Sequence, residues 1–223
     1  MSRYPNIVAL LLMIVLGFAL PGTAKETPSP EQALAELKAG NARYLEGVSK
    51  HPRIDPASRL KTAKFGQKPI ASVLSCADAR VPVELIFDKG FGELFVVRVA
   101  GNVCKTAELA SLEFGSLYLG TPLIVVLGHS ECGAVKAAIS DAELKGSLPL
   151  LVDVIRPAVA RARKKSPDAK ADDLTDRAIE ENVRLSIESI LKSPGIKKAV
   201  DSKKLLVVGA IRDLKSGKIR WLP

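Results

Sequence analysis

Four short, mainly apolar runs divide the chain, and longer stretches of mixed polar and apolar residues separate them. The runs are rich in β-branched residues and cover residues 70–74, 93–99, 123–127 and 205–211. Short runs of this kind are typical of strands that are buried on both faces of a parallel sheet. The sequence therefore predicts four such strands, with a last strand at 218–222 that returns along its predecessor as a hairpin.

The stretches between the strands have the signals of helices. Helices are expected at residues 83–87, 106–119, from 133 onward, 148–165 and 172–192. Strands that alternate with helices favour a parallel sheet with right-handed crossover connections. We therefore expect an α/β fold with a central, mostly parallel β-sheet flanked by helices.

A helical arm is expected before the first strand. Ser29 and Gln32 have the spacing of a capping box at the start of a helix. The helix that follows is amphipathic and is expected to end near Gly47. We assign residues 25–66 to this N-terminal helical arm and residues 67–223 to the α/β domain.

The first 24 residues have the pattern of a secretory signal peptide. Arg3 gives a basic start, residues 7–20 are apolar, and the small residues at 22–24 offer a cleavage site. The apolar stretch is short for a helix that spans a bilayer. We therefore expect cleavage after Ala24 and a periplasmic or secreted protein that has no membrane attachment once residues 1–24 are gone. An uncleaved membrane anchor is the alternative.

The chain is basic overall. Its 33 lysines and arginines outnumber its 24 acidic residues, which gives a net charge of +9. The positive charges are spread along the sequence, and aromatic residues make up only 4% of it, too few to form platforms that stack on nucleic-acid bases. We therefore expect no nucleic-acid partner, and a positive surface would instead favour the accumulation of small anions.

Two short motifs directly follow buried strands. They are Ser-Cys-Ala-Asp-Ala-Arg at 75–80 and Gly-His-Ser-Glu-Cys-Gly at 128–133. Open α/β sheets place their ligand sites at the carboxyl ends of their strands, so the two motifs are expected to meet. Cys76, His129 and Cys132 would then form the Cys2His ligand set of a catalytic zinc ion, with one position left open.

Zinc is the metal that this ligand set favours, because two sulfur ligands disfavour hard ions such as magnesium. We expect one zinc per chain. A strand-end cysteine can also be just a small buried apolar residue, which is the alternative for Cys76 and Cys132. Cys104, the third cysteine, is expected to be a buried structural thiol.

Asp78 and Arg80 are the predicted catalytic pair. Asp78 is close enough in sequence to Cys76 to reach the fourth position on the metal and block it. Arg80 can hold that carboxylate away through a bidentate pair. Water on an open zinc titrates near pH ~7, so hydroxide would be available at neutral pH. The pair is therefore expected to act as a switch in which Asp78 coordinates zinc only in the closed state.

The residues around these motifs resemble a β-class carbonic anhydrase. The resemblance is carried by residues 67–102, which hold the first motif, and by residues 125–138, which hold the second, and it extends over nearly all of 31–223. It implies a β-carbonic-anhydrase-like fold and a zinc lyase. Such an enzyme hydrates carbon dioxide reversibly to bicarbonate and a proton through zinc-bound hydroxide.

The resemblance also implies the substrate pocket. It implies that the amide of Gln67 donates a hydrogen bond to an oxygen of carbon dioxide and that Phe95 and Phe114 form apolar walls of the pocket. Periodicity alone would make the two phenylalanines core residues. Gly133, directly after a predicted ligand, would let the backbone approach the substrate and would open a helix whose N-terminus favours the anionic product.

The resemblance implies further a homodimer, or a homotetramer, in which the amphipathic N-terminal helix with Leu34, Leu37 and Tyr44 reaches over a partner. One departure from the family is informative. Some bacterial members bind bicarbonate in a second pocket that uses a tryptophan and a tyrosine, and here those positions are Val73 and Arg212. We therefore expect no cooperative inhibition by bicarbonate.

Other functions fit the same motifs. A hydrolase of the same architecture could act on carbon disulfide or carbonyl sulfide. A zinc-stabilised binding module without turnover is a second alternative, although a structural site would not need Asp78, Arg80 or Gln67. A thiol enzyme that uses Cys132 with His129 would leave Cys76 unexplained.

Overall fold

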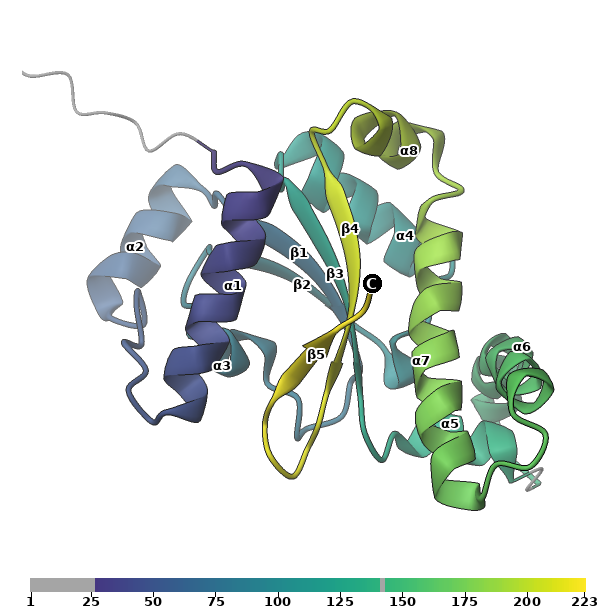
Figure 1. The fold of residues 1–223 in the computed structure, drawn as a ribbon. Helices are drawn as coiled ribbons and strands as arrows, with labels where there is room; N and C mark the ends of the chain where they lie inside the picture. Colours follow the sequence, from purple (N-terminus) through teal and green to yellow (C-terminus); the bar gives the residue numbers. More distant parts are fainter. Residues whose placement is uncertain (1–26, 141–142) are drawn as a thin grey trace, which may run out of the picture.

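The computed structural model describes residues 27–140 and 143–223, so the predicted signal peptide lies outside the described residues. A five-stranded sheet forms the centre of the molecule, with the strand order β2-β1-β3-β4-β5 (Figure 1). Its first four strands are mutually parallel, and β5 pairs antiparallel with β4. The strands are β1 (Ala71–Ser75), β2 (Leu94–Arg98), β3 (Leu123–His129), β4 (Leu206–Arg212) and β5 (Ile219–Trp221). The expected α/β fold is confirmed.

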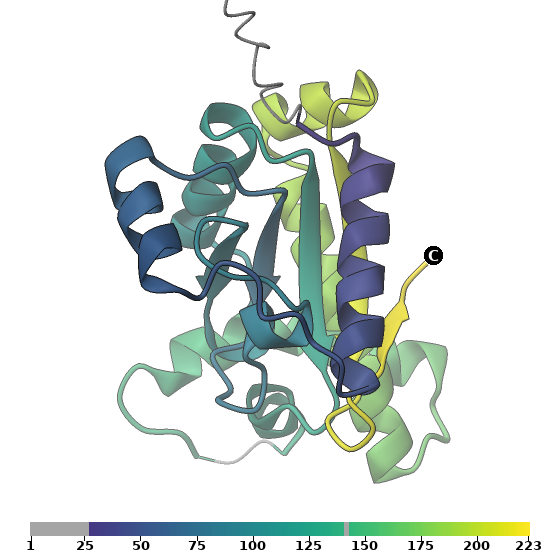
Figure 2. The same ribbon diagram turned by 90° about the vertical axis from the view of Figure 1, so that its left-hand side faces the viewer.

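Helices cover both faces of the sheet (Figures 1 and 2). The α-helices are α1 (Pro30–Leu45), α2 (Pro56–Phe65), α3 (Val83–Ile86), α4 (Thr106–Glu113), α5 (Gly133–Ile139), α6 (Leu148–Lys165), α7 (Ala171–Ile190) and α8 (Pro194–Asp201). A 3₁₀ turn, η1 (Ala100–Asn102), follows β2, and a π-helical turn, η2 (Phe114–Tyr118), extends α4. No helix within these two described segments is long and apolar enough to cross a bilayer.

Alternate residues of the central strands build two apolar layers. Val73 and Val125 face one side, where they pack in a cluster with residues of α1 and α3. Leu74 and Val126 face the other side, in a cluster with residues of α4, α7 and α8. Because both faces are covered, β1 and β3 are buried along their whole length, as their continuous apolar runs predict.

Helix α1 belongs to this core. Ala33 and Leu37 are fully buried in the cluster that also contains Val73 and Val125. We expected the apolar face of this helix to reach over a partner subunit, and the structure instead places that face on the chain's own sheet. The difference arises because the sheet leaves one face uncovered beside α3, and α1 is long enough to cover it (Figure 1).

A buried ion pair ties the end of α1 to the loop after α3. The Asp88 side chain is fully buried and accepts hydrogen bonds from Arg43 Nε at 2.6 Å and from the backbone N–H groups of Lys50 and His51. Burial alone would raise the pKa of Asp88, but Arg43 and these N–H groups outweigh it, so the pKa lies below its ordinary value. The charged carboxylate is therefore the form that stabilises the fold.

Asp88→Asn is expected to lower the free energy of unfolding by about 3 kcal/mol at pH 7, because it leaves Arg43 without its buried partner. The stabilisation is complete above the ordinary carboxyl pKa of about 4 and is lost as the pH falls through the lowered pKa of the folded state. Urea unfolding of both proteins should therefore show a difference that shrinks below pH ~4. Asp201→Asn, which removes an exposed i,i+4 pair with Lys197, is the control and should change little. An equally small change for Asp88→Asn would contradict the prediction.

Candidate metal centre

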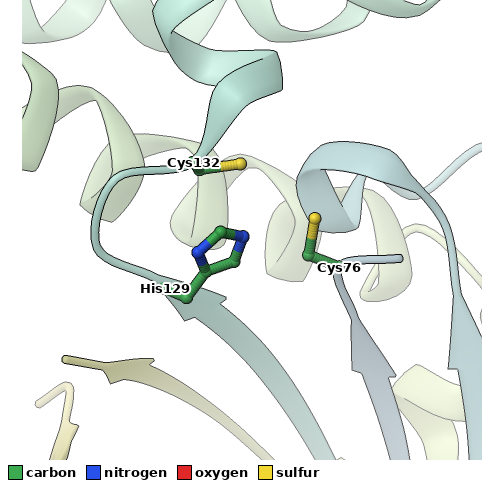
Figure 3. Close-up of side chains that lie close together, drawn as sticks. All are labelled: Cys76, His129 and Cys132. Atoms are coloured by element: carbon green, nitrogen blue, oxygen red, sulfur yellow. The ribbon is translucent and has the colours of Figure 1, made fainter. Parts of the chain in front are cut away.

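Three predicted ligands meet at the carboxyl edge of the sheet. Cys76 follows β1, His129 ends β3, and Cys132 immediately precedes α5 (Figure 3). Their ligand atoms all lie within 4.8 Å of one another, and all three residues are buried. Glu131, with a φ of 59°, turns the chain between the second and third ligands so that Cys132 comes back toward the strand end. Within the described residues, the predicted Cys2His cluster is thus assembled.

The imidazole of His129 is oriented for metal binding. Its Nδ1 lies 2.8 Å from the carbonyl oxygen of Ser130. A carbonyl oxygen can only accept a hydrogen bond, so Nδ1 carries a proton, and in the neutral imidazole Nε2 is the nitrogen whose lone pair can bind a metal. Nε2 is buried and has no hydrogen-bond partner among the described residues. A buried polar atom without a partner is costly, and a metal ion held by the two neighbouring sulfurs would satisfy it.

The two cysteines influence each other's protonation. A hydrogen bond from Cys132 lowers the pKa of Cys76 to about 4, and the same contact raises the pKa of Cys132. The N–H of Gly101 also donates to Sγ of Cys76 at 3.2 Å. The Cys76 thiolate, which is the form that binds metals, is therefore favoured before any metal arrives. Two sulfurs and one imidazole fit zinc, which takes such ligands in a tetrahedral set.

Asp78 and Arg80 form a bidentate pair beside the cluster. Arg80 Nε donates to Oδ1 of Asp78 at 2.9 Å, and Nη2 donates to Oδ2 at 2.7 Å. These hydrogen bonds hold the pKa of Asp78 well below its ordinary value, so the carboxylate is charged. Asp78 Oδ2 nevertheless lies only 3.9 Å from His129 Nε2. The carboxylate is thus next to the cluster and held by Arg80, in the paired arrangement that the sequence suggested.

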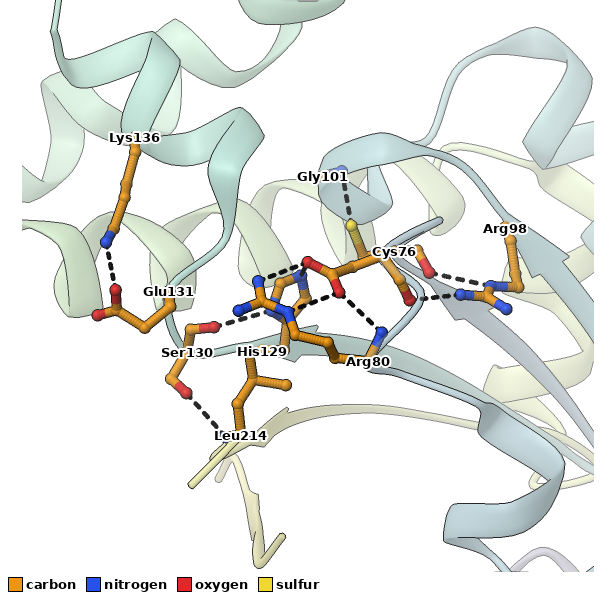
Figure 4. A network of polar contacts seen from close by, with 10 residues as sticks. Cys76, Arg80, Arg98, Gly101, His129, Ser130, Glu131, Lys136 and Leu214 are labelled. Carbon is orange, nitrogen blue, oxygen red and sulfur yellow. Dashed lines mark hydrogen bonds and ion pairs between the residues drawn. The ribbon is translucent and has the colours of Figure 1, made fainter. Parts of the chain in front are cut away.

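Arg98 supports the first motif, and the sequence analysis did not identify it. This residue ends β2, and its guanidinium donates to two backbone carbonyl oxygens, Cys76 O at 3.1 Å and Asp78 O at 2.6 Å (Figure 4). It therefore fixes the turn that presents both a predicted ligand and the predicted catalytic carboxylate.

Comparison with known proteins gives the family. A family model described as carbonic anhydrase matches residues 71–219, which include both motifs. Carbonic anhydrase 2 of Mycobacterium tuberculosis is 38% identical over 194 residues, which is 85% of this chain and 91% of that protein. The chain belongs to the carbonic anhydrase family. A carbonic anhydrase of Mycolicibacterium smegmatis, 34% identical over 86% of this chain and 92% of its own length, is a further relative.

Solved structures place this carbonic anhydrase in the β-class. The β-carbonic anhydrase CafA of Aspergillus fumigatus superposes with a TM-score of 0.69 at 28% identity, over 86% of this chain and 89% of its own. A structure from work on two tetrameric β-carbonic anhydrases of Sordaria macrospora has the same TM-score at 25% identity, over 85% of this chain and 95% of its own. The β-carbonic-anhydrase-like fold that the resemblance implied is confirmed.

Three residues predicted to form the substrate pocket of the carbonic anhydrase lie away from the cluster of their own chain. Phe95 pairs with Ser72, four residues before Cys76, which at the rise of a strand is about 13 Å away. Phe114 packs against Phe95, with ring centroids 6.0 Å apart, and Gln67 precedes β1 altogether. A single chain therefore does not bring these residues to Cys76, His129 and Cys132, and their role in binding substrate stays a prediction.

Gly133 does lie at the cluster, directly after Cys132 and at the start of α5. Apart from its chain neighbours and the backbone of its own helix, a Cβ at this position would meet no described atom within 4 Å. The space beside the predicted ligand is therefore open, which suits a small substrate, and binding by Gly133 remains a prediction.

Cys104 is separate from the metal ligands. It is buried in the apolar cluster that also contains Leu74 and Leu112. Burial raises the pKa of its thiol to about 12, so it stays protonated and unreactive. The expectation of a buried structural thiol is confirmed.

Proposed function

We propose that this chain is a zinc-dependent carbonic anhydrase that interconverts carbon dioxide and bicarbonate, with one zinc per chain. The observation that carries the proposal is the buried cluster of Cys76, His129 and Cys132 with an ionised Asp78 beside it. A binding module would need the cluster alone. The charged carboxylate and the arginine that restrains it are what a reaction at the open position of the metal would need.

Zinc held by the three ligands would keep a fourth position for water and lower the pKa of that water to about 7. The chain's own residues then divide the remaining tasks. Asp78 is charged and lies 3.9 Å from Nε2 of His129. It is therefore placed to orient a water at the fourth position and to accept a proton from it. Arg80 keeps Asp78 from taking the position itself, since both carboxylate oxygens are engaged by its guanidinium. The pair would thus gate the site.

A second copy of the chain would complete the substrate pocket. Strand β2 is an edge of the sheet, and two aromatic side chains that stack beside its Phe95 are exposed: Phe114 is 48% and Tyr118 81% exposed. Apolar exposure along an unpaired edge favours association. This surface includes Phe114 and lies next to Phe95 and Gln67, the predicted pocket residues. We therefore propose a homodimer or homotetramer whose partner supplies them, and sedimentation of the full chain should give a species larger than the monomer.

The proposed location of the mature enzyme is the periplasm or the exterior of the cell. The support comes from residues 1–24, whose basic start, apolar stretch and small residues match a signal peptide. Expression of the full chain in a bacterium should give a product that starts at Lys25. A product that retains the apolar stretch and sediments with membranes would favour the anchor instead.

Added bicarbonate is expected not to inhibit this enzyme cooperatively. Val73, at one position of the second pocket known in some relatives, is fully buried in the core. Arg212, at another, donates to the hydroxyl of Tyr44 at 3.2 Å and lies over its ring. The two side chains of that pocket are thus replaced by a core valine and by an arginine that faces Tyr44, although Nε and Nη1 of Arg212 have no hydrogen-bond partner among the described residues. Initial rates measured near neutral pH should fall at most hyperbolically as bicarbonate is added, and a steep sigmoidal loss would contradict this prediction.

Stopped-flow assays of the purified, zinc-loaded protein test the function. We expect hydration of carbon dioxide that disappears on chelation and returns with zinc. Hydrolysis of carbon disulfide or carbonyl sulfide without hydration of carbon dioxide would identify the alternative hydrolase. Full zinc occupancy without turnover of any of the three would identify a binding module.

A further inference from the structure

The turn η1 touches the proposed metal centre through its backbone. Gly101 and Asn102 have left-handed conformations, with φ values of 71° and 43°, and both are buried. This geometry points the N–H of Gly101 at Sγ of Cys76, 3.2 Å away (Figure 4). A Cβ on Gly101 would lie 2.7 Å from the side chain of Ile155 and 3.2 Å from that of Ala134, and any other residue would be strained at this φ, so the position favours glycine. The turn is therefore built to bring a backbone donor against a metal-binding sulfur.

Two buried polar side chains on α7 hold this turn. Asn182 Nδ2 donates to the carbonyl oxygen of Gly101 at 2.7 Å, and Ser186 Oγ donates to that of Asn102 at 2.9 Å. The two residues are one helical turn apart and are 2% and 3% exposed. They lie on the buried side of the helix, beside the apolar residues Ile179 and Val183. Polar groups at such positions are costly unless they are hydrogen-bonded, so their two bonds to η1 are specific features of the fold.

Attachment of α7 to the sheet does not depend on these two side chains. Val183 packs so closely on β3 and β4 that a Cβ on Gly128 or Gly209 would lie 2.7 or 2.8 Å from its methyl groups. Apolar side chains at 182 and 186 would serve that packing at least as well. The hydrogen bonds to η1 therefore account for the polar side chains of Asn182 and Ser186, whereas the packing of α7 on the sheet does not require them.

We infer that Asn182 and Ser186 are positioning residues for the metal-binding thiolate, acting through the backbone of Gly101. By fixing the carbonyl oxygens of the turn, they fix the direction of the neighbouring N–H that donates to Cys76. A hydrogen bond to a ligand sulfur orients the ligand and withdraws electron density from it. The inference rests on the proposed metal site, and α7 thereby contributes to the electronic properties of a site to which it supplies no ligand.

Cobalt(II) reports on this hydrogen bond directly, because its thiolate charge-transfer band depends on the electron density at sulfur. In Asn182→Ala the turn loses its stronger restraint, and the Gly101 N–H no longer points steadily at Cys76. We expect the band of the cobalt-substituted protein to move to longer wavelength. We also expect the affinity for zinc, measured by competition with a chelator, to fall about 10- to 100-fold. Ser186→Ala should change both in the same direction by less, and Ser186→Thr, which keeps the hydroxyl, should restore both.

Ser72→Ala is the matched control. Ser72 is also buried and hydrogen-bonded, to Thr121 Oγ1 at 2.8 Å, but it lies four residues before Cys76 on β1. It should lower the melting temperature without altering the cobalt spectrum or the zinc affinity. If Asn182→Ala and Ser186→Ala behave in the same way as this control, the inference is wrong. A wild-type protein with no cobalt–thiolate band at all would instead overturn the proposed metal site.

Discussion

Arg80→Ala is expected to abolish hydration of carbon dioxide while zinc stays bound. The guanidinium of Arg80 engages both oxygens of Asp78, whose carboxylate lies 3.9 Å from Nε2 of His129. Without Arg80 the charged carboxylate is free to occupy the open position of the metal, and substrate water is excluded. We expect hydration rates to fall at least 100-fold, to about the level of the chelated enzyme, as for removal of a group that holds the catalytic geometry. Zinc content per chain should stay at one.

Three variants make this experiment specific. Arg80→Lys keeps the charge but loses the planar fork, so an intermediate rate is expected. Asp78→Ala should leave the position open yet remain impaired, since the carboxylate that accepts the proton is gone. Lys136→Ala removes another exposed cation close to the cluster, one paired with Glu131, and should leave the rate unchanged. Near-normal activity of Arg80→Ala would exclude the proposed gate.

Cys132→Ser is expected to remove the zinc and, with it, all hydration activity. The three ligands come from the ends of β1 and β3 and from the start of α5, and no further histidine or cysteine lies in the described cluster to replace a lost one. Elemental analysis should show zinc per chain falling from one to nearly zero, and Cys76→Ser and His129→Ala should give the same result. Structural integrity can be followed by circular dichroism at the same time.

The chain offers a matched control for this change. Cys104 is equally a buried cysteine, but it lies among apolar residues and is not part of the cluster. Cys104→Ser should therefore keep one zinc per chain, although burying a hydroxyl among apolar residues should lower its melting temperature. Full zinc occupancy after Cys132→Ser would refute the ligand assignment.

The sheet could be predicted from the sequence because its central strands, β1 and β3, are buried on both faces and its outer parallel strands, β2 and β4, are partly buried. Such strands appear as continuous apolar runs, and the four runs correspond to β1 to β4. Helix α8 was missed, although Ser193 and Pro194 provide its N-cap and its first residue. It has only eight residues, too few for a convincing helical period. The helix expected at 106–119 is present as α4 followed directly by η2. The π-helical hydrogen bonding of η2 was not predicted, because no residue pattern indicates it.

The metal ligands could be predicted because side chains with metal chemistry sit directly at strand ends, where the topology must bring them together. Arg98 and Asn182 could not be identified in this way. Their partners are backbone carbonyl oxygens, which leave no trace in the sequence, and the partner of Asn182 is 81 residues away. The available signal was the occurrence of Asn182 and Ser186, four residues apart, among the apolar residues Ile179, Val183 and Ile190 of one helix.

Exchange of oxygen-18 between labelled carbon dioxide and water, followed at chemical equilibrium by mass spectrometry, tests the central claim most directly. It measures interconversion of carbon dioxide and bicarbonate without a pH indicator or a net reaction. We expect fast loss of label with the zinc-loaded protein, the uncatalysed rate after chelation, recovery when zinc is restored, and no recovery with Cys132→Ser. Loss of label at only the uncatalysed rate, in the presence of folded protein that holds one zinc per chain, would contradict the account.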